Sequence, residues 1–418
     1  MDLVLKNCKF VDKIGEYNIK IENGKIADIT KDPIKADQTV DIKNNYILPG
    51  FIDPHIHFRD PGLTQKEDFK TGSQAAANGG FTTVIDMPNT LPKTNTYKAL
   101  KEKIKIAQNK SVVNFKLQAG HNTLEEMKKM VELNPISFKV FMDLESDESL
   151  EKIFNDLSIL KQITNYEGLV ATHCEKKSIV ESETAKLKEK GENDAIDYTY
   201  ARPAQSEDES VRQAIELARA NDLKLHICHL SSNKSLELVK TASKSMAVSW
   251  EFTPHHLLLD NSAYDIYGTF VKTNPPLRPK DLSVRISDLD EKSIIGTDHA
   301  PHTLEDKEKG TWESSPGIPN LETVVPLILT EVNKGNIDLK LIPKIFSENA
   351  AEVYGLSNKG KIDIGYDADF TIIDIKREGQ FNIDEFKTKA EYSPFDGWKY
   401  KGLPIMTIVN GKIVMNKI

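Results

Sequence analysis

The chain has 418 residues and a formal net charge of −8, with 39% hydrophobic and 28% charged residues, a composition typical of a folded protein with a substantial core. The acidic balance argues against nucleic-acid binding, which needs a basic surface, and the sequence contains no apolar run long enough for a membrane span. The three cysteines, Cys8, Cys174 and Cys228, do not suggest a disulfide framework, so we expect a reducing, cytoplasmic location.

Both ends of the chain are predicted to be β structure. Short apolar segments alternate with turns, and Asn23-Gly24 and Asn410-Gly411 carry the hairpin signal. The expected strands cover residues 3–5, 17–21, 25–29, 369–374, 406–409 and 412–415. We expect residues 1–49 and 354–418 to combine into one small β-sandwich domain.

Residues 50–353 repeat another pattern, in which a short apolar run ends in polar residues and an amphipathic stretch such as 209–221 or 320–334 follows. Eight near-continuously apolar runs alternating with helices are typical of a (β/α)₈ barrel. The runs end near residues 55–57, 86–89, 120–121, 139–143, 173–175, 229–231, 253–256 and 298–302. Nearly all ten histidines lie at these ends, where barrel enzymes carry their active sites.

The first run ends in His55-Ile56-His57. Residues i and i+2 of a strand face the same side, so both imidazoles point into the barrel and can share a metal ion. An isolated pair of this kind is more often structural. Asp298, in Gly296-Thr297-Asp298-His299, ends the eighth run, where a carboxylate can contact a metal and take a proton from activated water. The alternative for Asp298 is an ordinary helix cap.

Lys139 lies in the middle of an apolar run, where an ammonium is costly to bury. Carboxylation to a metal-bridging carbamate and an ion pair at the barrel rim are equally compatible with this position. His173 and His229 end two further runs and can bind a second ion. His226 is three residues before His229 and is expected to be structural.

Together these segments resemble the amidohydrolase superfamily and, within it, the dihydroorotases, over residues 3–415. The motifs that carry the resemblance are long and occur in the family's order. They include Arg59-Asp60-Pro61-Gly62, Met87-Pro88-Asn89-Thr90, Pro254-His255-His256-Leu257, Asn274-Pro275-Pro276-Leu277-Arg278, Asp298-His299-Ala300-Pro301-His302 and Pro316-Gly317. One departure is Asn320, where the family usually has glycine.

The resemblance implies a role for each matching position. His55, His57 and Asp298 would bind one divalent ion, most simply Zn²⁺, and His173 and His229 a second. Lys139 would be carboxylated and bridge the two. Arg59 would bind the substrate carboxylate through its bidentate fork. The remaining residues of the implied substrate pocket are Asn89, Asn274, His302, Pro316 and Gly317.

The activity implied by the resemblance is the reversible cyclisation of N-carbamoyl-L-aspartate to L-dihydroorotate in pyrimidine (UMP) synthesis. A metal-bridged hydroxide would attack the ring carbonyl, with Asp298 as general acid and base. The alternatives are a hydantoinase or allantoinase, for which Arg59 is less expected, and a non-catalytic scaffold, which would lack ligands. The implied partners are the small-molecule substrate, a second copy of the chain and, as in some relatives, aspartate carbamoyltransferase.

Overall fold

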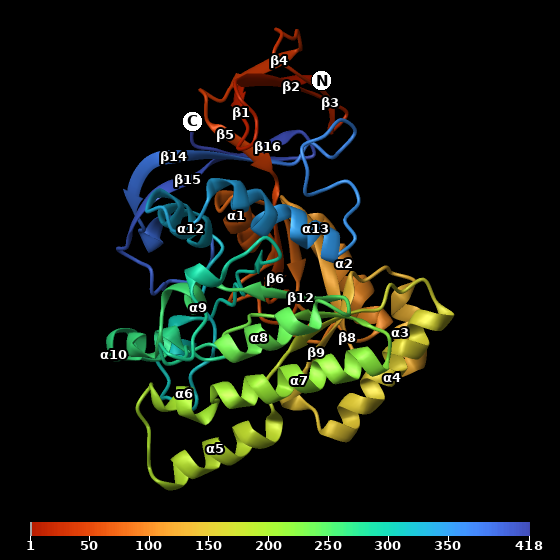
Figure 1. Ribbon diagram of the computed structural model, residues 1–418, viewed down its shortest axis with the longest axis vertical. Coiled ribbons are helices and arrows are strands. Elements are labelled where there is room, and N and C mark those ends of the chain that lie inside the picture. The colour runs from red at the N-terminus through yellow and green to blue at the C-terminus, as the bar shows by residue number, and fades with distance from the viewer. Residues whose placement is uncertain (1) are drawn as a thin grey trace.

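The computed structural model describes residues 2–418. Two eight-stranded sheets organise the chain, one a parallel barrel and the other a mixed sheet next to it (Figure 1). The barrel strands are β6 (Phe51–Ile56), β7 (Phe81–Asp86), β8 (Asn114–Gly120), β9 (Ser137–Phe141), β10 (Leu169–His173), β11 (Lys224–Ile227), β12 (Val248–Phe252) and β13 (Ile294–Ile295).

These strands follow one another around the barrel in sequence order, and every pairing is parallel. The chain just after β13 closes the circle, because Ile56 bridges His299 and the His57 amide donates to the His299 carbonyl at 2.9 Å. The prediction of a (β/α)₈ barrel is therefore confirmed. Parallel closure brings the carboxyl ends of all eight strands to one mouth.

Helices follow the barrel strands and cover them. They are α1 (Phe69–Asn78), α2 (Tyr97–Lys110), α3 (Leu124–Val131), α4 (Asp147–Ile163), α5 (Lys177–Glu189), α6 (Asp197–Ala201), α7 (Ala204–Ala220), α8 (Asn233–Ala242), α9 (Pro254–Leu258), α10 (Tyr264–Tyr267), α11 (Leu304–Lys307), α12 (Val324–Asn333) and α13 (Asn349–Val353).

Helix α4 illustrates how the sequence specifies these helices. Ser146 caps its first turn by accepting from the Ser149 amide at 3.2 Å. Asp147 and Glu148 place negative charge at the positive end of the helix dipole. Five apolar side chains at three- or four-residue spacing then face the barrel, and all five are buried: Leu150, Ile153, Phe154, Leu157 and Leu160. Each contributes roughly 1.5–3 kcal/mol of burial free energy.

The expected helix at 320–334 begins later than the sequence indicates, at Val324. The Asn320 side chain donates to the Thr297 carbonyl at 2.9 Å and to His255 Nδ1 at 3.0 Å. Residue 320 is thereby tied to the strand ends, and the helix starts only after it. The helix expected at 209–221 extends further in the amino-terminal direction and starts at Ala204.

The mixed sheet joins the two chain ends (Figure 1). Its strands are β1 (Leu3–Lys9), β2 (Glu16–Glu22), β3 (Lys25–Thr30), β4 (Gln38–Asp41), β5 (Tyr46–Pro49), β14 (Phe370–Gln380), β15 (Lys399–Val409) and β16 (Lys412–Asn416). Strand β5 lies between β1 and β14, parallel to the first and antiparallel to the second. The expected β domain from both chain ends is therefore confirmed, while its boundaries at 49 and 354 remain predictions.

Both predicted hairpins are present, between β2 and β3 and between β15 and β16. Asn23 and Gly24 have φ of 51° and 76°, and Asn410 and Gly411 have 49° and 75°. Two successive positive φ angles define the type I′ turn that Asn-Gly favours.

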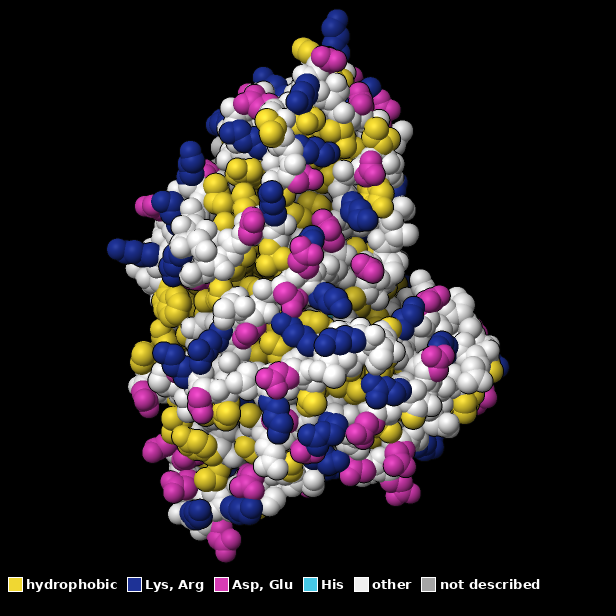
Figure 2. Space-filling view, viewed as in Figure 1, with side chains coloured by type: hydrophobic (Ala, Val, Ile, Leu, Met, Phe, Trp, Pro, Cys, Tyr) yellow, Lys and Arg dark blue, Asp and Glu magenta, His cyan; other side chains and the backbone are white. Residues whose placement is uncertain are grey.

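Within residues 2–418, no helix is long and apolar enough to cross a membrane. Figure 2 shows Lys and Arg side chains mixed with Asp and Glu over the visible face, without a broad patch of either sign.

Candidate metal and substrate site

A cavity of about 460 Å³ opens at the carboxyl ends of the barrel strands. Every residue predicted for metal or substrate binding lines it. They are His55, His57, Arg59, Asn89, Lys139, His173, His229, Asn274, Asp298, His302, Pro316 and Gly317. The barrel thus brings together residues from His55 to Gly317, which are 262 positions apart in the sequence. The contacts among these residues decide what the cavity can bind.

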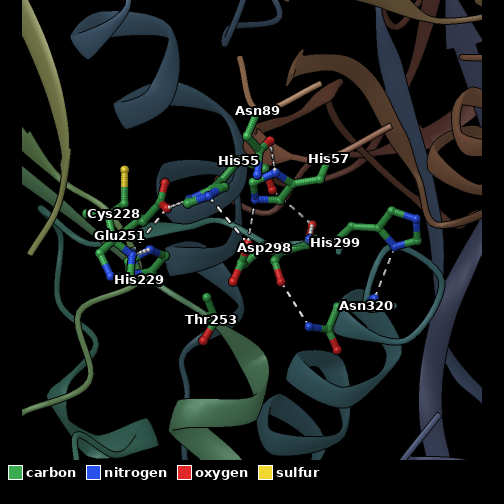
Figure 3. Close-up of polar contacts among 12 residues, drawn as sticks. His55, His57, Asn89, Cys228, His229, Glu251, Thr253, Asp298, His299 and Asn320 are labelled. Carbon is green, nitrogen blue, oxygen red and sulfur yellow. Dashed lines mark hydrogen bonds and ion pairs between the residues drawn. The ribbon is translucent and has the colours of Figure 1, made fainter. Parts of the chain in front are cut away.

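His55, His57 and Asp298 form the first group of ligands (Figure 3). Asp298 Oδ1 lies 3.0 Å from His57 Nε2 and 3.4 Å from His55 Nε2. The Nδ1 atom of His55 contacts the Glu251 carboxylate, and that of His57 contacts Asn89 Oδ1 at 2.7 Å. Because carboxylate and amide oxygens accept, each Nδ1 carries the proton.

This tautomer directs two nitrogen lone pairs at one carboxylate oxygen, an arrangement that needs a positive charge at its centre. Burial lowers the pKa of His55, but the Glu251 and Asp298 carboxylates outweigh burial and raise it to about 10. Two imidazoles and a carboxylate are also a common donor set for zinc, so these residues fit a divalent cation.

His173 and His229 form the second group. His173 Nε2 donates to Glu175 at 2.8 Å, which leaves Nδ1 as a lone pair 3.0 Å from His229 Nε2. Burial, followed by the neighbouring His173, holds the pKa of His229 well below its ordinary value, so its ring is neutral. The His229 Nδ1 atom is buried without a hydrogen-bond partner in the described chain. Two imidazole nitrogens 3.0 Å apart fit a second cation.

Lys139 lies in β9, lines the same cavity and is 1% exposed. Its Nζ contacts Cys228 Sγ at 2.8 Å and lies 5.2 Å from the centre of the Phe141 ring. The alternative of an ion pair at the barrel rim finds no support in these contacts, because neither partner is an acid. A buried amine beside a potential metal pair fits the carbamate interpretation.

Three site residues have left-handed backbones although none is glycine. Arg59, His229 and Asp298 have φ of 60°, 37° and 46°. Such conformations cost of order 1 kcal/mol or more each and persist where surrounding contacts enforce them. Surrounding contacts therefore hold two candidate ligands and the candidate carboxylate-binding arginine in these conformations.

Arg59 and His302 line one wall of the cavity, and Lys66 lies behind His302. His302 Nε2 donates to the Pro316 carbonyl at 3.0 Å, and its Nδ1 accepts from Lys66 Nζ at 3.0 Å. The Arg59 guanidinium lies against His302 and donates through Nε to the Pro301 carbonyl at 3.3 Å. Within residues 2–418 these contacts include no carboxylate, so no acid neutralises the Arg59 guanidinium.

The Pro316-Gly317 loop, which His302 contacts, has a conformation that only glycine permits. Gly317 has a φ of 152°, and a Cβ there would lie 2.1 Å from the Ala300 carbonyl oxygen. The buried ammonium of Lys307 donates to three carbonyls of this region, those of Lys272, Ser315 and Gly317. The polar stretch 303–315 is therefore anchored beside the cavity from within.

The amide side chains predicted for the substrate pocket have protein partners. Asn89 orients His57 through the contact described above, and Asn274 Oδ1 accepts from the Tyr198 hydroxyl at 2.7 Å. His226 does not line the cavity, in keeping with its structural interpretation, and contacts Ser249 and Glu251.

Two buried acids behind the ligands were not predicted. Glu175 and Glu251 are both 0% exposed and contact ligand histidines. A signal for each exists in the sequence: Glu175 is two residues after His173, and Glu251 interrupts an apolar run, the same criterion that singled out Lys139.

Fold and site together define a (β/α)₈-barrel enzyme with two clusters of metal-ligand side chains at the strand ends. The amidohydrolase family model matches residues 46–414. A dihydroorotase of Methanosphaera stadtmanae is 48% identical over 420 residues, covering 99% of this chain and 96% of the relative. A dihydroorotase of Methanothermobacter thermautotrophicus is 46% identical, covering 99% and 94%.

Among solved structures, the L-hydantoinase (dihydropyrimidinase) from Arthrobacter aurescens superposes with a TM-score of 0.93 at 31% identity, covering 100% of this chain and 96% of that one. The chain belongs to the amidohydrolase family, whose members depend on metal ions.

Proposed function

We propose that the chain is a dihydroorotase, which catalyses the reversible cyclisation of N-carbamoyl-L-aspartate to L-dihydroorotate and water in pyrimidine synthesis. The observation that carries the proposal is Arg59, an arginine without a carboxylate partner whose guanidinium opens into the same cavity as the candidate ligands. The 46% and 48% identical relatives are named dihydroorotases over nearly their whole length.

His55, His57 and Asp298 would hold one divalent ion and His173 and His229 a second, with Lys139 between them as a carbamate. Zn²⁺ suits this imidazole-rich set. When bound, such ions polarise a carbonyl and lower the pKa of water.

Asp298 is the proton carrier of the proposed mechanism. Burial raises the pKa of Asp298, but His55 and His57 outweigh burial and hold it well below its ordinary value. The carboxylate is therefore ionised at neutral pH and can take the proton of the attacking water during hydrolysis. Returning that proton to the leaving ring nitrogen completes ring opening, and the reverse order serves ring closure.

Arg59 would grip the substrate carboxylate through two parallel hydrogen bonds. His302 and the Pro316-Gly317 loop support the guanidinium from one side, and Asn274 lines the cavity where the ring would lie. Asn89 acts by holding His57.

A hydantoinase is the second candidate, because the L-hydantoinase structure superposes so closely. A non-catalytic scaffold is disfavoured, because every expected ligand lines one cavity. Arg59 is the feature that discriminates between the two activities, since hydantoins lack the ring carboxylate of dihydroorotate that Arg59 would bind.

The test is a comparison of zinc-loaded wild type and Arg59→Met on L-dihydroorotate and on a 5-substituted hydantoin. Charged hydrogen bonds contribute about 1.5–3 kcal/mol each, so loss of two should lower kcat/KM for dihydroorotate by at least 100-fold while zinc content is kept. Arg212→Met, on the surface of α7, is the control. Equal turnover of dihydroorotate by Arg59→Met, or a wild-type preference for the hydantoin, would contradict the proposal.

Self-association and association with aspartate carbamoyltransferase remain predictions, which sedimentation velocity of the chain alone and of the mixture can test. A cytoplasmic location is supported by the three cysteines, all free within the described residues.

A further inference from the structure

Glu251 is a buried carboxylate that the proposed reaction does not use. It lies in β12 between Trp250 and Phe252 and is 0% exposed. Its Oε1 atom accepts from His55 Nδ1 and from the His229 backbone amide, the latter at 3.1 Å. Its Oε2 atom accepts from His226 Nε2 at 3.1 Å. Figure 3 shows Glu251 between His55 and His229.

Glu251 is also near enough to His55 and Cys228 to be considered a metal ligand itself. Its contacts argue against that role, because both oxygens already accept hydrogen bonds. His55 could join such a group only through Nδ1, which faces Glu251, whereas its Nε2 faces Asp298. Behind the carboxylate there is no room to turn, since a Cβ on Gly296 would lie 2.7 Å from Oε2.

The contact with His55 fixes that ring's tautomer. A carboxylate accepts only, so Nδ1 carries the proton and the Nε2 lone pair points at the first ligand group. The contact with His229 fixes a backbone instead. The His229 φ of 37° is costly for a non-glycine residue. The hydrogen bond from the His229 backbone N–H to Glu251 Oε1 stabilises this conformation, which brings the His229 ring to His173.

Glu251 Oε1 therefore contacts both His55, from the first ligand group, and His229, from the second. The other oxygen is held by His226, whose Nδ1 in turn contacts Ser249 at 2.9 Å. We propose that Glu251 is a positioning residue for both candidate metal subsites, orienting the His55 ring and the His229 backbone at once. This inference rests on the metal site of the proposed function.

The test measures zinc affinity, without turnover, on metal-free wild type, Glu251→Gln and the control Glu322→Gln, each titrated with Zn²⁺ against a chromophoric chelator. Loss of a carboxylate that orients a ligand histidine lowers metal affinity by about 10–100-fold. We expect a loss of that size for Glu251→Gln. Glu322 is another buried glutamate, 7% exposed, that contacts Asn78 and the Lys387 amide and does not line the cavity. Its variant should bind zinc like wild type.

Unchanged zinc affinity in Glu251→Gln would overturn the inference and leave the proposed function standing, whereas a wild type that binds no zinc would overturn both. An equal loss in Glu322→Gln would overturn it too, because the effect would be general destabilisation. Should Glu251→Gln fail to fold, ¹⁵N NMR of the histidine side chains in zinc-loaded wild type decides: protonated Nδ1 on His55 is required, and protonated Nε2 refutes the role.

Discussion

Arg202 is predicted to stabilise the fold by neutralising a buried acid behind His173. Its Nε lies 3.0 Å from both oxygens of Glu175, and a terminal nitrogen lies 2.8 Å from Asp143. Burial raises the pKa of Glu175, but Arg202 outweighs burial and holds it well below its ordinary value. Arg202→Met would leave Glu175 charged and 0% exposed. Removing one partner of such a pair costs about 3–5 kcal/mol.

The assay is urea denaturation at pH 7. Arg202→Met should lose about 3–5 kcal/mol of unfolding free energy, and Arg202→Met/Glu175→Gln should recover more than half of it, because no uncompensated charge remains. Arg212→Met breaks a half-exposed pair with Glu209 and should cost less than about 1 kcal/mol. A loss below about 1 kcal/mol in Arg202→Met, or additive losses in the double variant, would refute the reasoning.

Two further predictions concern a proton carrier and a buried acid. Asp298→Asn should keep the fold and bound zinc but lose about 10²–10⁴-fold in kcat; near wild-type turnover would remove Asp298 from its role. Burial raises the pKa of Glu322 from 4.5 to about 7, so the folded chain binds more protons between these pH values and loses stability as pH rises through them. Glu322→Gln lacks this titration, and its stability relative to wild type should improve by about 3 kcal/mol from pH 4 to pH 8; a pH-independent difference in urea midpoints would contradict this.

The barrel and its mouth were predictable from the sequence because their signals are local. Each apolar run marks a strand, and polar residues at its carboxyl end mark the face where parallel strands finish. His55 and His57 follow from alternation along one strand. Lys139 follows from the cost of burying an amine, although the carbamate itself does not.

The supporting contacts were not predictable, because they join residues far apart in the chain. Glu251 contacts His55 although the two residues are 196 positions apart, and no sequence pattern indicates that these two residues pair. Strand β5 between β1 and β14 is a similar case, since its partners come from opposite ends of the chain. The late start of α12 depends on Asn320 reaching Thr297 and His255, a tertiary contact that overrides the helical pattern.

The central claim is that six side chains, in or just after β6, β9, β10, β11 and β13, hold divalent cations that the reaction requires. The most direct test is turnover of L-dihydroorotate by the metal-free chain as zinc is added back in the presence of bicarbonate. The account predicts no turnover without zinc and a rise to a plateau at about two ions per chain. Undiminished ring opening by the metal-free chain would contradict it.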